Sequence, residues 1–175
     1  AAGATLKELG LDTPPPPRGY AVQVRVNMER MNADGSVVPT GGTLTANGAL
    51  SAKTLNLSSG LLNGTGVVTV NNVMGWSGGT ISTGGVGSTN IAGGATLIGS
   101  GAADKLVDGG RVTNAGTVNW TGAGNLVINN GANVANNGTF DLQTDAGIQY
   151  TNGSSGGVPT FTNTAVLKKS AGTTS

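Results

Sequence analysis

The only charged cluster in the repetitive part of the sequence lies within residues 102–111 and contains Asp104, Lys105, Asp108 and Arg111. Polysaccharide lyases and hydrolases place clustered carboxylates and a lysine or arginine on neighbouring strands, because these groups move a proton to or from the sugar. A lyase would use Asp104 and Asp108 to hold calcium and Arg111 as the base. We favour a coil corner with solvated charges and keep the lyase as the alternative.

Asp141 and Asp145 are the other carboxylates after residue 35, and each lies where a predicted strand leaves for a turn. Calcium binds about six to eight oxygen ligands, and two aspartates alone do not supply that number. The sequence therefore predicts no metal at this pair.

Trp76 and Trp120 lie 44 residues apart in similar local sequences. An exposed indole offers a flat apolar platform on which a sugar ring can stack, so the two side chains are candidates for a carbohydrate-contact face. Two buried indoles would instead fill the core. Both interpretations stay open at this point.

The composition excludes several kinds of site. The chain has no Cys and no His, which removes disulfides, thiol catalysis, the common zinc ligands and the commonest general base. The nine Lys and Arg are scattered and the net charge is +1, so we expect no nucleic-acid binding. No stretch reaches the ~18 consecutive apolar residues of a membrane helix. No cofactor is expected either.

The chain changes character near residue 36. Residues 1–35 hold eight of the seventeen charges, whereas residues 36–103 hold only Lys53. The first segment predicts a charged extension or cap with a short helix over 4–11, a proline spacer over 14–17 and a strand over 20–27. Residues 36–175 form the second predicted unit.

The second unit is repetitive. Gly-Thr followed by an apolar residue begins at positions 42, 79, 116 and 138, and related steps at 64, 94 and near 160 give a spacing of about 22 residues. That length suits one coil of two or three short strands. The sequence predicts an all-β fold, a parallel β-helix or β-solenoid. An antiparallel sandwich or jelly roll is the second candidate, because it also has short strands separated by Gly and Asn.

The predicted coils have asparagine-rich corners and a thin aliphatic core. Asn129–Gly131 and Asn136–Gly138 suit sharp corners, because Asn and Gly tolerate the left-handed backbone conformation. Stacked coils also allow asparagine side chains to form amide ladders. The side chains predicted to point inward are Leu55, Leu57, Leu62, Val68, Val70, Ile81, Ile91, Leu97, Val112, Val118, Leu126, Ile128, Val134, Phe140, Leu142, Ile148, Phe161 and Val166.

Two segments carry family resemblances. Residues 41–169, especially 112–120 and 136–141, resemble the passenger and haemagglutinin-like β-helix repeats of large bacterial surface proteins. This resemblance implies a fold and a location outside the cell, with no particular ligand.

Residues 4–46 look like the C-terminal part of biotin carboxylase domains, through 18–29, 34–35 and 39–44. In that family an arginine stabilises the biotin enolate, and the matching position is Arg25. The nucleotide-binding lobe, the phosphate loop and the magnesium glutamates of the family have no counterpart in this sequence. The resemblance therefore implies an inactive fragment.

Together these features predict a non-enzymatic extracellular protein with a structural or adhesive role. A solenoid has open ends, so homo-oligomers or filaments formed end to end or side by side are expected partners, together with cell-surface glycans. The alternatives are a carbohydrate-binding or polysaccharide-cleaving β-helix protein and an inactive fragment derived from biotin carboxylase.

Overall fold

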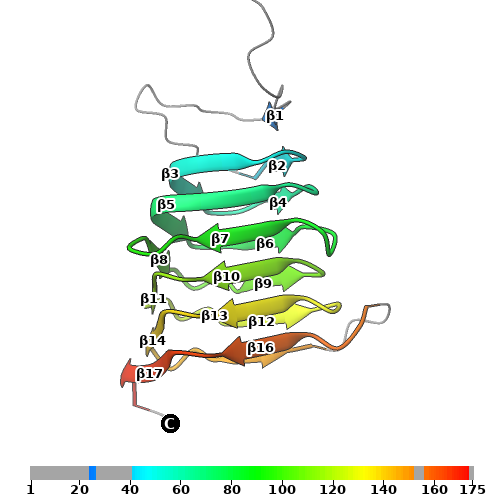
Figure 1. Ribbon diagram of the computed structural model, residues 1–175. Helices are drawn as coiled ribbons and strands as arrows, with labels where there is room; N and C mark the ends of the chain where they lie inside the picture. The colour runs from blue at the N-terminus through cyan, green and yellow to red at the C-terminus, as the bar shows by residue number, and fades with distance from the viewer. Residues whose placement is uncertain (1–23, 27–40, 152–155, 174–175) are drawn as a thin grey trace, which may run out of the picture.

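The computed structural model describes residues 24–26, 41–151 and 156–173, and all regular elements in them are β-strands. The strands stack into a column with the N-terminal strands at one end and β17 at the other (Figure 1). The predicted helix over 4–11, the proline spacer and the boundary near residue 36 lie outside the described residues.

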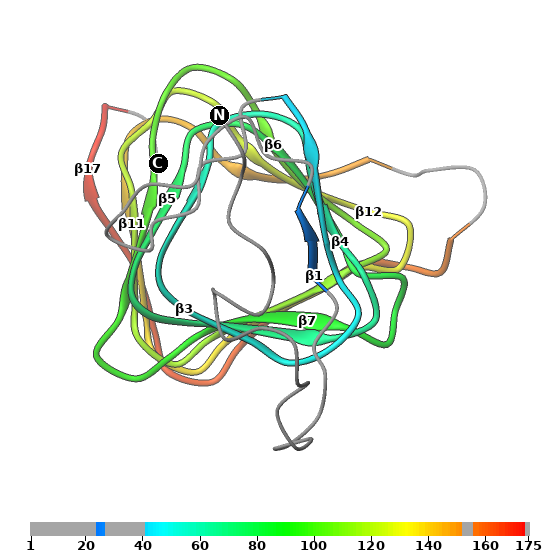
Figure 2. The ribbon, with the colours of Figure 1, turned by 90° about the horizontal axis from the view of Figure 1, so that it is seen from above.

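Two sheets wrap around one core. Seen along the axis, the coils superimpose and enclose the core on all sides (Figure 2). The first sheet contains, in order, β1(Val24–Val26), β2(Thr43–Ala46), β4(Leu61–Asn63), β6(Gly79–Ser82), β9(Lys105–Asp108), β12(Leu126–Asn129) and β15(Ile148–Tyr150).

The second sheet bends around a corner and forms the other two faces. Its long strands β3(Leu50–Leu57) and β5(Val67–Trp76) turn that corner without a break, whereas later coils use two strands each. These pairs are β7(Ser88–Ile91) with β8(Thr96–Gly99), β10(Arg111–Asn114) with β11(Thr117–Trp120), β13(Asn133–Asn136) with β14(Thr139–Gln143), and β16(Thr160–Asn163) with β17(Val166–Ala171).

Every strand pair after residue 42 is parallel, and only β1 pairs with its neighbour β2 in the antiparallel sense. The parallel β-solenoid is therefore confirmed and the antiparallel sandwich is wrong. Paired residues differ in number by 22 between Val112 and Val134, by 18 between Leu50 and Val68, and by 27 between Val134 and Phe161. The predicted coil of about 22 residues holds, with shorter and longer coils at the two ends.

The Gly-Thr steps that revealed the period do not occupy one position of the coil. Thr43 begins a strand of the first sheet and Thr80 is the second residue of another, whereas Thr117 and Thr139 begin strands on another face. A side chain at Gly138 would lie 2.1 Å from a carbonyl oxygen of the coil above. Glycine is needed at more than one corner of the coil. The Gly-Thr motif therefore marks corners of different kinds and not one repeated position.

The two predicted asparagine corners differ. Asn130 and Gly131 both have positive φ, 50° and 71°, so this corner uses the left-handed conformation as expected. The corner at Asn137–Gly138 does not use that conformation. Its glycine is required by the close approach of the neighbouring coil rather than by backbone conformation.

The core follows the predicted alternation along most of its length. Leu142, Ile148 and Phe161 are partly buried. Val166 is half exposed, contrary to expectation, because it pairs with Thr139 on the outward face, and Leu167, which pairs with Phe140, takes the inward position. Large core residues that the sequence analysis did not select are Leu44, Met74, Trp76, Val107 and Trp120. The other fourteen predicted inward residues are buried.

Within the described residues, no helix has the length and apolar character needed to cross a membrane.

Candidate functional site

The two tryptophans lie in the core. Trp76 pairs with Gly99 and Gly99 pairs with Trp120, so the indoles are two coils apart, as their spacing predicted. Each is only 1% exposed, and their ring centroids are 6.0 Å apart in an edge-to-face arrangement. A sugar ring has no access to either face. The predicted carbohydrate contact at Trp76 and Trp120 is therefore wrong, and the indoles are core residues.

An aromatic column continues from these indoles toward the C-terminal end. The Trp120 ring stacks at 6.2 Å on Phe140, which in turn meets Phe161 edge to face at 5.6 Å. The indole nitrogen of Trp120 donates a hydrogen bond of 2.9 Å to the carbonyl of Gly124. These four rings span five coils in a chain with only 3% aromatic residues.

Lys105 is buried, contrary to the expectation that its cluster is solvated. Its strand neighbours are Gly79 in the coil before it and Leu126 in the coil after it. The ammonium donates a 3.2 Å hydrogen bond to the carbonyl of Gly101 and lies 5.2 Å from the centre of the Trp120 ring. Lys105 and Val107 pair with Leu126 and Ile128, which were predicted to point inward, so the repeat was a sequence signal that Lys105 also points inward.

Burial lowers the pKa of Lys105, and the nearby Asp104 carboxylate opposes that effect. The folded chain therefore releases this proton at a lower pH than the unfolded chain. Below the lowered pKa, the buried charge destabilises the fold. As pH rises from there toward the ordinary lysine value of 10.5, that penalty disappears.

We predict that Lys105→Met raises the free energy of unfolding at pH 7. The advantage of the variant over the parent should shrink as the pH rises from the lowered pKa through 10.5, because the parent lysine is neutral in both states only above that value. Denaturant unfolding at several pH values measures this difference. Lys53→Met, at an exposed position of β3, is the control and should show little difference at any pH; parallel pH curves for the parent and Lys105→Met would refute the prediction.

Asp104 and Asp108 bind the following coil at separate places. Asp104 Oδ1 accepts hydrogen bonds from the backbone nitrogen and side-chain amide of Asn125, at 2.7 and 3.2 Å. Asp108 Oδ1 accepts from the side-chain amide of Asn130. Asp104 precedes β9 and Asp108 ends it. Four extended residues separate their α-carbons by about 13 Å, which is too far for two aspartates to share one calcium ion.

Arg111 begins β10, and its side chain is exposed. Its backbone nitrogen donates a 3.1 Å hydrogen bond to the hydroxyl of Thr83 in the preceding coil. The structure thus places Asp104, Asp108 and Arg111 around corners of the same coil. The shared calcium site that the lyase alternative needs is not formed by Asp104 and Asp108.

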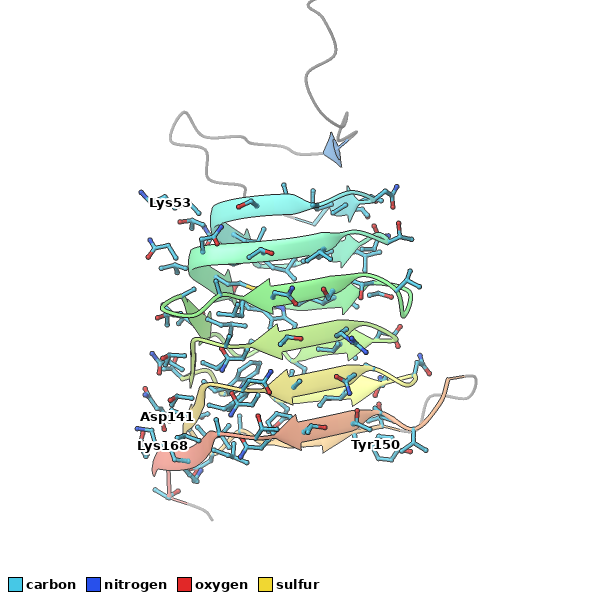
Figure 3. All side chains as sticks on the ribbon, viewed as in Figure 1. Lys53, Asp141, Tyr150 and Lys168 are labelled. Atoms are coloured by element: carbon cyan, nitrogen blue, oxygen red, sulfur yellow. The ribbon has the colours of Figure 1, made fainter. Side chains whose placement is uncertain are left out.

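Asp141 and Asp145 hold the last coil. Asp141 Oδ2 lies 3.3 Å from Lys168 Nζ and accepts a 2.9 Å hydrogen bond from Gln143 (Figure 3). The hydrogen bond from Gln143 is the main reason that the pKa of Asp141 is lowered. Asp145 accepts hydrogen bonds of 2.7 and 2.8 Å from the backbone nitrogen and hydroxyl of Thr173.

A ladder of asparagine side chains runs through the last three coils, as the composition suggested. Asn114 Nδ2 donates to Asn136 Oδ1 at 2.7 Å, and Asn136 Nδ2 donates to Asn163 Oδ1 at 2.6 Å. Each of the first two rungs also donates to a backbone carbonyl of the following coil, at Thr139 and Val166. The ladder therefore joins both the side chains and the backbones of successive coils.

Arg25 lies in β1 and is the strand partner of Thr45. The biotin-carboxylase role suggested for it stays a prediction. In the described part of the chain, no three His, Cys, Asp or Glu side chains lie together as metal ligands.

Comparison of the chain with protein-family models, with curated proteins and with solved structures found no match.

Proposed function

We propose that this protein is a non-enzymatic structural or adhesive β-solenoid that acts outside the cell as a scaffold or spacer. One observation carries the proposal: the four aspartates after residue 35 connect coils to each other. Asp104 and Asp108 bind the coil after them, and Asp141 and Asp145 bind the last coil. Groups engaged in this way hold the stack together.

The asparagine ladder supports the same role. Its side-chain amides add hydrogen bonds between successive coils inside the solenoid. A buried amide whose partners are all in place favours the one alignment of neighbouring coils in which those partners meet. A protein that keeps a fixed length between two points needs such a register. The location outside the cell rests on the resemblance of residues 41–169 to surface-protein repeats. Self-association through the coil ends belongs to the same proposal.

The experiment compares the parent with Asp108→Ala and Arg111→Ala on a panel of acidic polysaccharides. A structural protein should release no new reducing or unsaturated ends from any of them, and Asp108→Ala should lower only the thermal stability. Cleavage by the parent that disappears in either variant would overturn the proposal in favour of the polysaccharide-cleaving alternative. Asp145→Ala, which removes a carboxylate at the last coil, is the matched control.

A further inference from the structure

Two exposed valines lie together on the side of the solenoid. Outside the last coil, the large hydrophobic residues exposed in the described part of the chain are Val67, Val86 and Ile98. Val86 is 74% exposed and Val67 is 42% exposed. Val67 pairs with Ser88, two residues after Val86, so these two valines are neighbours, whereas Ile98 lies on another face. Single exposed hydrophobics are ordinary, but grouped ones are typical of interaction surfaces.

Val86 is carried by a loop that is longer than its equivalents. Residues 83–87 connect β6 to β7 at the corner that follows the first sheet (Figure 1). The corresponding connections in the other coils before the last are shorter, and they are 47–49, 64–66, 109–110 and 130–132. In repeat proteins, insertions into single repeats map to loops on one face, which is often the binding face. The extra length therefore points to a function of this corner.

The base of this loop is held by hydrogen bonds, and its tip stands clear of the coils. The buried Thr83 hydroxyl donates a 2.8 Å hydrogen bond to the carbonyl of Gly87, whose nitrogen donates to the Thr83 carbonyl at 3.1 Å. Gly84 and Gly85 have φ of 62° and 79°, and a β-carbon at either would meet no atom within 4 Å. The loop therefore presents Val86 from a fixed base.

An exposed arginine lies next to the two valines. Strands β7 and β10 are neighbours, and their register places Arg111 beside Ser88. Two strand spacings, about 10 Å, therefore separate Arg111 from Val67. The backbone nitrogen of Arg111 also donates a 3.1 Å hydrogen bond to the Thr83 hydroxyl at the base of the loop. The same hydroxyl thus connects the loop to the strand that carries the arginine.

The Arg111 guanidinium has no carboxylate of its own. Its side chain is exposed, and the ion pairs among the described residues are those of Lys168 and Lys169. Asp108, the nearest acidic residue in the sequence, accepts a hydrogen bond from Asn130 in the following coil. A guanidinium can form two parallel hydrogen bonds with one carboxylate, so this corner suits a partner that brings a carboxylate.

The chemistry of this corner favours a protein partner. Nucleic acids and anionic membranes attract clusters of cations, whereas Arg111 is a single one. A sugar ring stacks on an aromatic side chain, and residues 64–70, 83–91 and 109–114 contain none. The four aspartates after residue 35 already hold coils together. Within the described residues, a second copy of the chain therefore offers no free carboxylate to this corner.

We propose that Val67, Val86 and Arg111 form a docking site for a protein segment that presents an aliphatic side chain next to a carboxylate. The valines cover the aliphatic side chain, and the guanidinium binds the carboxylate. The site lies on middle coils, each of which has a described coil on either side. This inference rests on the proposed adhesive function and names the class of its partner.

Selection from a random library of short peptides displayed on phage tests the site, because the library has no bias toward this corner. The full chain is the bait, and fluorescence polarisation measures the binding of synthetic copies of the selected peptides. These peptides should combine an acidic residue with an aliphatic one. Arg111→Gln and Val86→Ser should each weaken their binding about tenfold or more. Both changes affect exposed side chains, so both variants should unfold at the same temperature as the parent.

Lys53→Gln and Ile98→Ser are the matched controls, since they change an exposed cation and an exposed aliphatic side chain elsewhere on the surface. Both should leave the binding unchanged. Equal weakening by site and control variants would overturn the proposal, as would selected peptides without acidic residues or a selection that enriches no peptide. Retention of the parent on an acidic polysaccharide that Arg111→Gln abolishes would overturn it in favour of a glycan.

The polysaccharide cleavage assay does not depend on this docking site. A chain that cleaves no polysaccharide and enriches no peptide would therefore remove the docking site and leave the structural function in place.

Discussion

Asn136→Ala is expected to lower the free energy of unfolding by about 3–5 kcal/mol, because it removes three hydrogen bonds between coils and leaves an N–H of the buried Asn114 without its partner. Asn136 is fully buried, and its amide bonds Asn163 and the carbonyl of Val166. Its side-chain oxygen accepts from Asn114. Removing the amide therefore breaks both bonds to the last coil and leaves Asn114, which is buried, with its bond to the Thr139 carbonyl alone. Equilibrium unfolding in urea measures the loss.

Asn163→Ala is the matched control, since it removes the same side chain from the exposed last rung of the ladder. Asn136 still donates to the carbonyl of Val166 in that variant. The expected loss is about 1 kcal/mol. Equal losses for the two variants would mean that the ladder adds nothing beyond a single surface hydrogen bond.

Gly99→Ala is expected to cost about 3 kcal/mol, the upper part of the range for overpacked cores. An added β-carbon would lie 2.3 Å from Cε3 of Trp120, and no real contact is that short. The ring has little freedom to move, because Trp76 and Phe140 pack against it and Gly124 accepts its hydrogen bond. The clash must therefore displace the aromatic column or the backbone.

A double-mutant cycle with Trp120→Leu isolates this effect. Leu142 is the strand partner of Trp120 in the next coil, so a leucine side chain suits this inward position. In the Trp120→Leu background, Gly99→Ala should cost close to nothing, and thermal unfolding of the four proteins gives the coupling. A cost that is the same in both backgrounds would show that Gly99 is needed for its backbone and not for space beside the indole.

The sequence predicted the coil architecture because its signals are local. Gly, Asn and Thr recur at corners, and the aliphatic positions alternate between them, so the period and most inward residues follow from the one-dimensional pattern. The Asn114 ladder also follows, because its rungs lie one coil apart. These features depend on a position and its equivalent in the next coil, and the sequence contains both.

The candidate site could not be predicted in the same way. Whether Trp76 and Trp120 face inward depends on Gly99, which lies between them and leaves the space that their rings fill. At Gly99, a missing side chain in one coil decides the environment of a large side chain in another. The burial of Lys105 depends on partners that only the fold brings near it, the Gly101 carbonyl and the Trp120 ring. Composition and period do not reveal that kind of complementarity.

We propose that the chain acts as a structural rod in which each coil is held by its neighbours along the axis. Pulling on the two ends of a single molecule tests this most directly. The account predicts a series of separate steps, each releasing one coil of about 22 residues, or at most about 75 Å of extended chain. A single large extension that unfolds the whole solenoid at once would contradict it.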